Sequence, residues 1–333
     1  MLYCKASKIK SMKMLSKHGT MKFEMKNCAL VGPGAVGLYY GGLLAKSGVR
    51  LKVLARSDYA ALHAEGITLR MMDVDTGRLK VTYRIQPEMV ERDARAIGPV
   101  DWIILAAKAT ANQALLPALQ AMVEPGTTRL LTLQNGMGNV EFLAKHFPGN
   151  PILAGLCFVC VNRKAPAVVE NYLPGRVEIG SLDDQYPEMA AQAVAAFTGA
   201  GIQCRHTSVL DQAIWRKLCW NVPFNGLAIA AGGITTDLIL ANDALVTRAR
   251  RLMEEIQEAA AREGHEITDS FLQGQFEATE KMGVYRPSSL IDFQEGRAVE
   301  VEAIFGEPLR RGQALGLEMP ELSKLYAEIS TVA

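Results

Sequence analysis

The sequence contains no run of the ~20 uncharged apolar residues that a helix needs to cross a bilayer. It also lacks an excess of either charge, because 36 Lys and Arg stand against 35 Asp and Glu in 333 residues, for a formal net charge of +1. A nucleic-acid binder with a strongly basic face is therefore not indicated. Since 49% of the residues are hydrophobic and single cores stop growing near ~250–300 residues, we expect two domains, no membrane segment and no nucleic-acid partner.

Cysteine and histidine are scarce and show no metal-ligand pattern. The six cysteines and five histidines have no paired ligand spacing, so we expect no metal. Cys157 and Cys160 form a CxxC, but they lie in the apolar run 152–161, which reads as a buried strand whose alternation points the two thiols to opposite faces. We expect no redox role for this pair. Scattered free thiols in a long chain favour a reducing, cytoplasmic setting.

Residues 1–26 have a different composition from the rest of the chain. They carry seven lysines and five methionines and lack the continuous apolar segment of a signal peptide. A targeting presequence is one interpretation. We favour the other, a disordered or spurious extension in which Met21 or Met25 is the real beginning.

Short apolar runs alternate with helical segments in residues 27–206. Strands are predicted at 27–31, 50–55, 100–106 and 129–133, and helices at 37–47 and 111–123, the second with Pro117 as a blemish. Strands that alternate with helices are typical of a doubly wound parallel sheet. We therefore expect an N-terminal α/β domain of the Rossmann type.

The pattern changes near residue 207. Strand-like runs disappear, and helical periodicity takes their place at 211–230, 244–264, 288–295 and 299–315. We expect residues 207–333 to form an all-helical C-terminal domain that carries the substrate and catalytic groups. Oligomeric state cannot be read from the sequence, and a homodimer through this helical half is left open.

A GxGxxG motif follows the first predicted strand and opens the first predicted helix. It consists of Gly32, Pro33, Gly34, Ala35, Val36 and Gly37. Gly32 permits the tight turn, Gly34 lets the backbone approach a pyrophosphate, and Gly37 lets the helix pack close to the strand. The helix N-terminus then offers free N–H groups and a positive dipole end to the phosphates. This context predicts a dinucleotide site, against the plainer reading of a glycine-rich turn.

The end of the second predicted strand indicates which dinucleotide binds. An NAD site places an acid there for the ribose 2′-hydroxyl, whereas this chain has Ala55, Arg56 and Ser57. A guanidinium can hold a 2′-phosphate bidentately, and a carboxylate would repel it. Arg56 thus favours NADP(H), the alternative being an ordinary solvated arginine.

Lys217, Asn221 and Asn225 are spaced four residues apart in the helix predicted at 211–230. This spacing places them on one face of a helix that is otherwise largely apolar, so they need polar partners. A ligand and a solvated face are equally weighted alternatives from the spacing alone. Pro223 lies between the two asparagines and should kink the helix, which makes the position of Asn225 less certain than that of Lys217.

Several segments together resemble the ketopantoate reductase family. They are CALVGPGAVGLYYGGLLAKSG, LAR, IILAAKA, LQNGMGN, WRKLCWNVPFN and PSSLIDFQEGRAVEVE, in this order from residue 28 to residue 302. The glycine motif is shared by many dehydrogenases, whereas the later segments in combination are far more specific. The resemblance covers nearly the whole chain after residue 26.

The resemblance implies a role for each matching residue. Lys217 matches the general acid that protonates the carbonyl oxygen, and Glu300 matches the carboxylate that binds the substrate hydroxyl. The polar anchors of the substrate are matched by Asn221, Asn225 and Ser288. Asn135 matches the asparagine at the junction of cofactor and substrate, and Lys108 a lysine beside the nicotinamide ribose. Glu302, two residues beyond Glu300, is the alternative acid, and we expect Glu300 to lie in the first turn of a helix, whose dipole favours its ionised form.

The activity that the resemblance implies is the NADPH-dependent reduction of ketopantoate, a 2-oxo acid, in the biosynthesis of pantothenate. Two other interpretations stay open. A sister enzyme could use another 2-oxo acid or a β-hydroxy acid, and a non-catalytic sensor could merely bind NADP. The pair of Lys217 and Glu300 argues against the sensor, because a sensor needs no acid.

Overall fold

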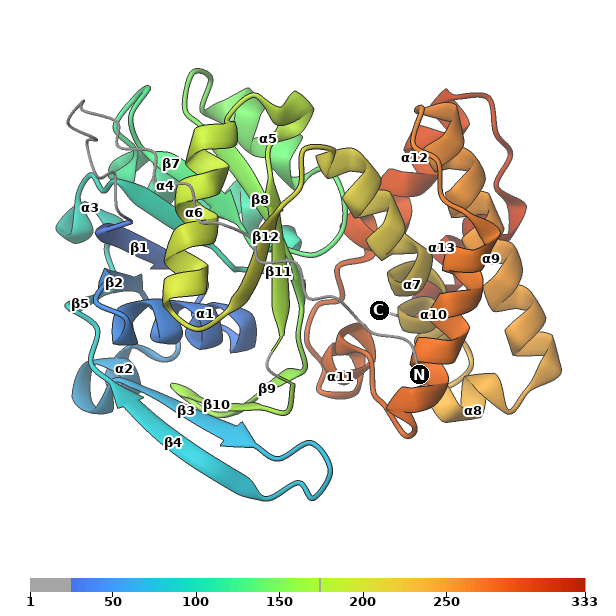
Figure 1. Ribbon diagram of the computed structural model, residues 1–333, viewed down its shortest axis with the longest axis horizontal. Helices are drawn as coiled ribbons and strands as arrows, with labels where there is room; N and C mark the ends of the chain where they lie inside the picture. The colour runs from blue at the N-terminus through green and yellow to red at the C-terminus, as the bar shows by residue number, and fades with distance from the viewer. Residues whose placement is uncertain (1–24, 174, 333) are drawn as a thin grey trace, which may run out of the picture.

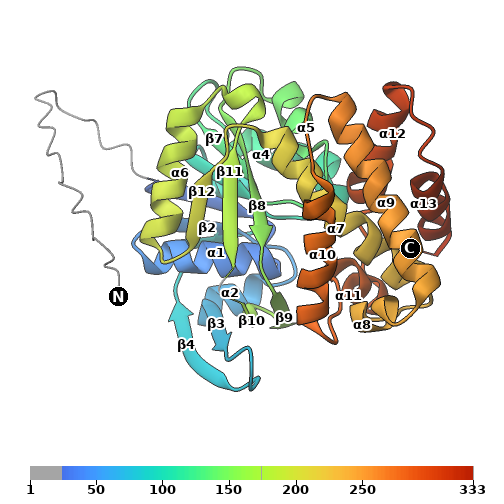
Figure 2. The ribbon, with the colours of Figure 1, turned by 45° about the vertical axis from the view of Figure 1, so that its right-hand side comes forward.

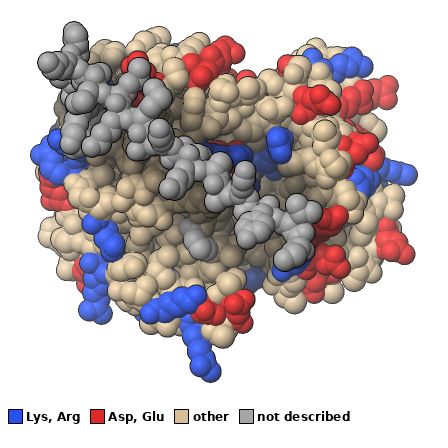
Figure 3. Space-filling view, in the orientation of Figure 1, with Lys and Arg blue, Asp and Glu red and all other residues tan. Residues whose placement is uncertain are grey.

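The computed structural model describes residues 25–173 and 175–332, which form an α/β part followed by a helical part (Figure 1). Met25 and Lys26, which we had grouped with the preceding segment, belong to the fold. Met25 is buried, and the carbonyl of Lys26 accepts from the backbone N–H of Arg50 over 2.8 Å. The other residues of that predicted extension, 1–24, lie outside the described residues. On the face shown in Figure 3, basic and acidic side chains are interspersed.

The α/β part is built on a sheet of eight strands in the order β12-β11-β8-β7-β6-β1-β2-β5. All neighbours are parallel except β8 and β11, so β11 and β12 run against the other six. The strands are β1 (Asn27–Val31), β2 (Arg50–Leu54), β5 (Met89–Glu91), β6 (Trp102–Leu105), β7 (Arg129–Thr132), β8 (Ile152–Phe158), β11 (Arg176–Gly180) and β12 (Gln203–His206). The prediction of a doubly wound parallel sheet is confirmed. The strand order reverses beside β1, which is where open α/β sheets bind ligands.

Helices cover both faces of this sheet (Figures 1 and 2). They are α1 (Ala35–Lys46), α2 (Tyr59–Glu65), α3 (Ala94–Ile97), α4 (Asn112–Met122), α5 (Asn139–His146) and α6 (Pro187–Gly199), with short turns of 3₁₀-helix at Ala109–Ala111 and Leu182–Asp184. Strand β1 explains why the sheet needs two covers. Cys28 and Leu30 enter the core that contains α1 and α6, and Ala29 and Val31 enter the core that contains α4 and α5. A central parallel strand is apolar throughout for this reason.

A second sheet of four strands, in the order β4-β3-β10-β9, was not predicted. Its strands are β3 (Ile67–Met72), β4 (Leu79–Ile85), β9 (Val161–Ala165) and β10 (Val168–Asn171). The prediction of one strand over residues 152–161 was wrong, because β8 ends at Phe158 and the chain then turns into β9. Asp58 ties this second sheet to the end of β2. Its carboxylate accepts from the backbone N–H of Ala167 over 3.0 Å and pairs with Arg163.

The helical part confirms the prediction for the C-terminal half and adds α8, α10 and α13 to it. Its elements are α7 (Leu210–Ala230), α8 (Thr236–Leu240), α9 (Asp243–Arg262), α10 (Asp269–Met282), α11 (Ser288–Gln294), the π-helical turn η3 (Glu302–Gly306), α12 (Glu307–Ala314) and α13 (Pro320–Val332). Helix α7 is central and runs through Pro223 as one helix. None of the helices in the described ranges is long and apolar enough to cross a membrane.

Candidate active site

The glycine turn (residues 32–37) joins β1 to α1, and two of its glycines leave no room for a side chain. Gly32 has φ +88°, and a Cβ there would lie 2.1 Å from the backbone N of Ala107. A Cβ on Gly37 would lie 2.4 Å from the carbonyl O of Gly32. Around Gly34, by contrast, no described heavy atom beyond its own neighbours in the chain lies within 4 Å of the Cβ position. The turn is therefore packed on the protein side and open at Gly34.

Helix α1 begins at this turn with no capping side chain. Gly34 occupies the N-cap position, and no side chain of the described residues accepts from the first turn. The first N–H groups of a helix need acceptors and carry its positive dipole end. Together with the open side of Gly34, they fit the phosphates of a dinucleotide.

Arg56 follows β2, and its side chain is exposed. It forms no ion pair within residues 25–173 and 175–332. The nearest acid in the sequence, Asp58, is 2% exposed and is held by Ala167 and Arg163. At the end of β2 the exposed charged side chain is therefore the cation Arg56, whereas the carboxylate of Asp58 is buried and bound within the protein.

Lys217 extends from α7 to the carboxyl edge of the large sheet. Its Nζ lies 2.9 Å from Oδ1 of Asn135, in the turn after β7. It also lies 5.5 Å from the centre of the Phe158 ring, at the end of β8. We did not single out Phe158 in the sequence, because no local pattern places the end of one strand beside a helix of the other part.

The environment of Lys217 shifts its acidity. Burial lowers the pKa of its ammonium below the ordinary value. Cys157, Glu300 and Glu178 oppose this with smaller effects that raise the pKa. The sequence left open whether burial or a neighbouring acid wins, and burial dominates here. A lysine with a lowered pKa releases its proton more readily, as a general acid near neutral pH must.

Glu300, which also belongs to the helical part, contacts the segment that follows β6 at the same edge of the sheet. Its Oε1 accepts from the backbone N–H of Ala109 over 2.9 Å, and burial raises the pKa of its carboxyl. Ala109, Lys108 and Lys217 oppose this rise. The prediction that Glu300 lies in the first turn of a helix was wrong, because it precedes the first helical residue, Val301.

Glu302, the alternative acid, points elsewhere. Its side chain is 61% exposed, and its carboxylate accepts from Arg310 over 2.7 Å and from the hydroxyl of Tyr326. Of the two acids, Glu300 is the one whose charge acts on Lys217.

Lys108 connects the two parts of the molecule. Its ammonium donates to the carbonyl of Ala298 over 2.7 Å and pairs with Asp292 of α11. Asp292 also accepts from Arg297 over 2.9 Å. The segment after β6 is thus tied to the turn that leads to Glu300.

The remaining predicted anchors lie on α7 and α11. Asn221 is 8% exposed, and its side-chain amide forms no hydrogen bond with the described residues. Asn225 is 2% exposed, and both polar atoms of its side-chain amide form hydrogen bonds within the protein. Its Nδ2 donates to the carbonyl of Asn221 over 3.0 Å, and its Oδ1 accepts from the N–H of Ser289 over 3.1 Å. Ser288, the first residue of α11, is exposed. Asn225 therefore holds the start of α11 in place. The side-chain amide of Asn221 and the hydroxyl of Ser288 remain available to bind a ligand.

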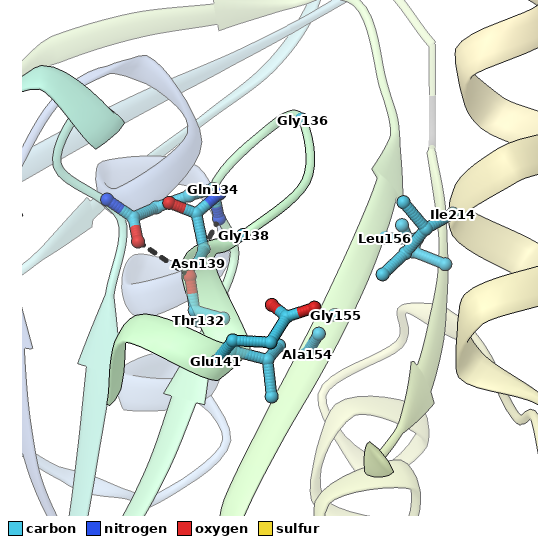
Figure 4. Close-up of a pocket in the computed structure, with 11 residues that line it drawn as sticks. Thr132, Gln134, Gly136, Gly138, Asn139, Glu141, Ala154, Gly155, Leu156 and Ile214 are labelled. Carbon is cyan, nitrogen blue, oxygen red and sulfur yellow. Dashed lines mark hydrogen bonds between the residues drawn. The ribbon is translucent and has the colours of Figure 1, made fainter. Parts of the chain in front are cut away.

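A small cavity of about 10 Å³, enough for roughly one water molecule, lies behind the turn of residues 134–139. Thr132, Gln134 and Glu141 line it on one side and Ile214 of α7 on the other (Figure 4). In the described ranges, no group of three or more His, Cys, Asp or Glu side chains is placed to hold a metal ion.

The turn of residues 134–139 also docks on the C-terminal part. The N–H of Met137 donates to the carbonyl of Ala303 over 2.8 Å. Gly136 has φ +83°, and a Cβ there would lie 2.3 Å from the same carbonyl oxygen. Gly138 has a similar φ of +87°, but the nearest atom to its Cβ position is a side-chain carbon of Glu307 at 3.4 Å.

We expect Gly136→Ala to lower the free energy of unfolding more than Gly138→Ala does. A left-handed backbone costs an L-residue roughly 1–2 kcal/mol at either position. Only at residue 136 does the new Cβ overlap backbone, which adds about 1–3 kcal/mol. Urea unfolding of both variants measures the difference. Equal losses would contradict close docking of the turn on Ala303.

The nucleotide-binding turn, with a lysine and a carboxyl at the edge of the same sheet, defines the class of protein: an oxidoreductase with an NAD(P)-binding fold. More particularly, the chain belongs to the ketopantoate reductase PanE/ApbA family. The model of the family's N-terminal domain matches residues 28–184, and that of its C-terminal domain matches residues 209–333.

Individual relatives agree with this assignment. The chain is 33% identical over 306 residues to 2-dehydropantoate 2-reductase of Nostoc sp., covering 90% of this chain and 93% of the relative. It is similar to the crystal structure of 2-dehydropantoate 2-reductase from Geobacter metallireducens GS-15, with 35% identity, a TM-score of 0.85, and coverage of 92% and 99% of the two chains. The ternary structure of D-mandelate dehydrogenase with NADH and anilino(oxo)acetate shares the fold, with 21% identity, a TM-score of 0.82, and coverage of 91% and 97%.

Proposed function

We propose that this protein reduces 2-dehydropantoate (ketopantoate) to pantoate with NADPH. The observation that carries the proposal is that Lys217 and Glu300, both from the helical part, bond to the α/β part at the carboxyl edge of the sheet, Lys217 to Asn135 and Glu300 to Ala109. In this proposal residues 27–206 form the NADP-binding domain and residues 207–333 the substrate domain.

The residues of the site divide the work of the reaction. Bound NADPH would supply the hydride, with its pyrophosphate at the glycine turn and its 2′-phosphate at Arg56. Lys217 holds the proton that passes to the carbonyl oxygen, and Asn135 orients the ammonium. Glu300 accepts from the substrate hydroxyl, and Asn221 and Ser288 donate to the carboxylate. Steady-state oxidation of NADPH with ketopantoate and a panel of other 2-oxo acids tests the assignment.

The second candidate is a sister oxidoreductase acting on another 2-oxo acid. It is supported by the shared fold of D-mandelate dehydrogenase and by the Phe158 ring beside Lys217, which would suit an apolar substrate side chain. Higher kcat/KM for another acid of the panel than for ketopantoate would favour this candidate.

We expect NADPH to bind more tightly than NADH, and Arg56→Ala to remove the difference. Loss of a charge-assisted contact should weaken NADPH binding by about 1.5–3 kcal/mol and leave NADH binding nearly unchanged. Arg50, at the other end of β2, is also exposed and serves as the control, so Arg50→Ala should affect neither. Fluorescence titration with both cofactors measures the dissociation constants. Equal weakening of NADPH and NADH by Arg56→Ala would contradict the assignment.

A further inference from the structure

Four buried polar side chains lie behind Asn135, at the carboxyl ends of β6 and β7. They are Thr132, Gln134, Asn112 and Asn139, and none is more than 9% exposed. Asn112 and Asn139 are the first residues of α4 and α5, and Thr132 and Gln134 lie side by side in Figure 4. Buried amides without partners are costly, so the partners of this group show what it does.

Gln134 fixes one end of the group. Its Oε1 accepts from the hydroxyl of Thr132 over 2.9 Å. Its Nε2 donates to Oδ1 of Asn112 over 2.7 Å and to the carbonyl of Ala107 over 2.8 Å. The backbone of Ala107 also packs against Gly32, so Gln134 is linked through Ala107 to the glycine turn.

The other end of the group holds Asn135. Nδ2 of Asn112 donates to Oδ1 of Asn139 over 3.0 Å, and Nδ2 of Asn139 donates to the main-chain carbonyl of Asn135 over 2.9 Å. The side-chain Oδ1 of Asn135 accepts from Lys217 over 2.9 Å. Gln134, Asn112 and Asn139 each use the side-chain oxygen to accept and the side-chain nitrogen to donate, which fixes the orientation of these three amides.

We propose that Asn139, held in place by Asn112 and Gln134, is a positioning residue that fixes Asn135 against the ammonium of Lys217. Among the described residues no hydrogen bond joins Asn139 to Lys217, so Asn139 acts on Lys217 only through Asn135. The catalytic consequence rests on the proposed function. The effect on Lys217 itself does not, because it is a property of the protein without substrate.

Asn139→Ala tests the proposal, with Asn150→Ala as its matched control. Asn150 is also a buried asparagine of the α/β part, 4% exposed. Its Nδ2 donates to the carbonyls of Glu124 and Thr128 over 3.0 and 2.8 Å, at the amino end of β7 and away from Lys217. Both variants lose hydrogen bonds from a buried side chain to main-chain carbonyls, but only Asn139→Ala loses the hydrogen bond that holds Asn135.

The first measurement is the pKa of Lys217, taken from the pH dependence of its acetylation rate by mass spectrometry without substrate. Asn135 stabilises the protonated ammonium, so release of Asn135 should lower this pKa in Asn139→Ala. The other groups that face Lys217, namely Cys157, Glu178 and Glu300, are the same in every variant. Asn112→Ala, one hydrogen bond further from Asn135, should give a smaller shift in the same direction, and Asn150→Ala none.

The second measurement is turnover. Because a misplacement of ~1 Å can reduce rates about 100-fold, kcat of Asn139→Ala should fall on the order of 10- to 100-fold, with the limb of the pH profile at high pH moved to lower pH. An unchanged Lys217 pKa together with a loss of Tm equal to that of Asn150→Ala would overturn the proposal. If Asn139→Ala does not fold, Asn112→Ala decides by the same two criteria. Failure of the wild type to reduce ketopantoate would contradict only the proposed function, because the labelling experiment needs no substrate.

Discussion

Lys217→Ala is expected to lower kcat about 10²–10⁴-fold while the dissociation constant of NADPH changes little. A positioned general acid contributes an effect of this size. The glycine turn and Arg56, which we propose to hold the cofactor, lie in the other part of the molecule from Lys217. Single-turnover rates and cofactor titrations on the same preparation separate the two quantities.

Two comparisons sharpen the test of Lys217. Lys217→Arg keeps a positive charge beside Asn135 but donates a proton poorly, so its turnover should resemble that of the alanine variant. Lys145→Ala changes a lysine in the last turn of α5 and should leave turnover unchanged. Near-normal turnover of Lys217→Arg would show that the site needs a charge rather than an acid.

The pH dependence of the wild type follows from the direction of the shift at Lys217. The lysine acts as an acid only when protonated, so kcat should fall as pH rises through its pKa. Because burial lowers that pKa, the fall should begin below the range of an exposed lysine. In Lys217→Ala this limb should be absent from the pH profile of the residual activity. A limb that persists unchanged would assign the titration to another group.

The sequence predicted the elements whose signals are local. An apolar run such as β1, which ends at a glycine, and the long helices α7 and α9 can be recognised from their own residues. The second sheet has no such signal. Strand β4 is mostly exposed, and β3 and β10 pair across a long stretch of sequence, so only the tertiary structure brings them together.

The site shows the same limit. The spacing of Lys217, Asn221 and Asn225 is visible in the sequence, but the internal use of Asn225 at the start of α11 is not. Glu300 and Glu302 are two residues apart, and only the tertiary structure shows that Glu300 bonds to Ala109 whereas Glu302 bonds to Arg310. The amides of Asn112 and Asn139 begin separate helices, and nothing in either segment indicates that they meet.

The identity of the substrate depends on how Glu300 is used. Oε1 of Glu300 accepts from Ala109, and Oε2 forms no hydrogen bond with the described residues, which leaves it to accept from a substrate hydroxyl. Burial raises the pKa of this carboxyl, and the N–H of Ala109 and the ammonium groups of Lys108 and Lys217 oppose that rise, toward the ionised carboxylate that such a bond requires. In the proposed function, Asn221 and Ser288 would bind the carboxylate of ketopantoate, Lys217 its ketone oxygen, and Glu300 its hydroxyl.

We therefore expect the wild type to prefer ketopantoate over the 2-oxo acid of the same skeleton that lacks the hydroxyl, by up to ~10⁴-fold in kcat/KM. Without the hydroxyl, the buried carboxylate would stay desolvated and lose its partner. Glu300→Ala should narrow the preference mainly by damaging turnover of ketopantoate, and Glu300→Gln, which keeps an acceptor oxygen and the shape, should retain part of it. Glu302→Gln is the control, because this exposed acid pairs with Arg310 and should not affect selectivity. The values of kcat/KM for both acids with all four proteins decide the matter. If the wild type uses the two acids equally, or favours the acid without the hydroxyl, Glu300 does not bind a hydroxyl and the sister oxidoreductase becomes the better assignment.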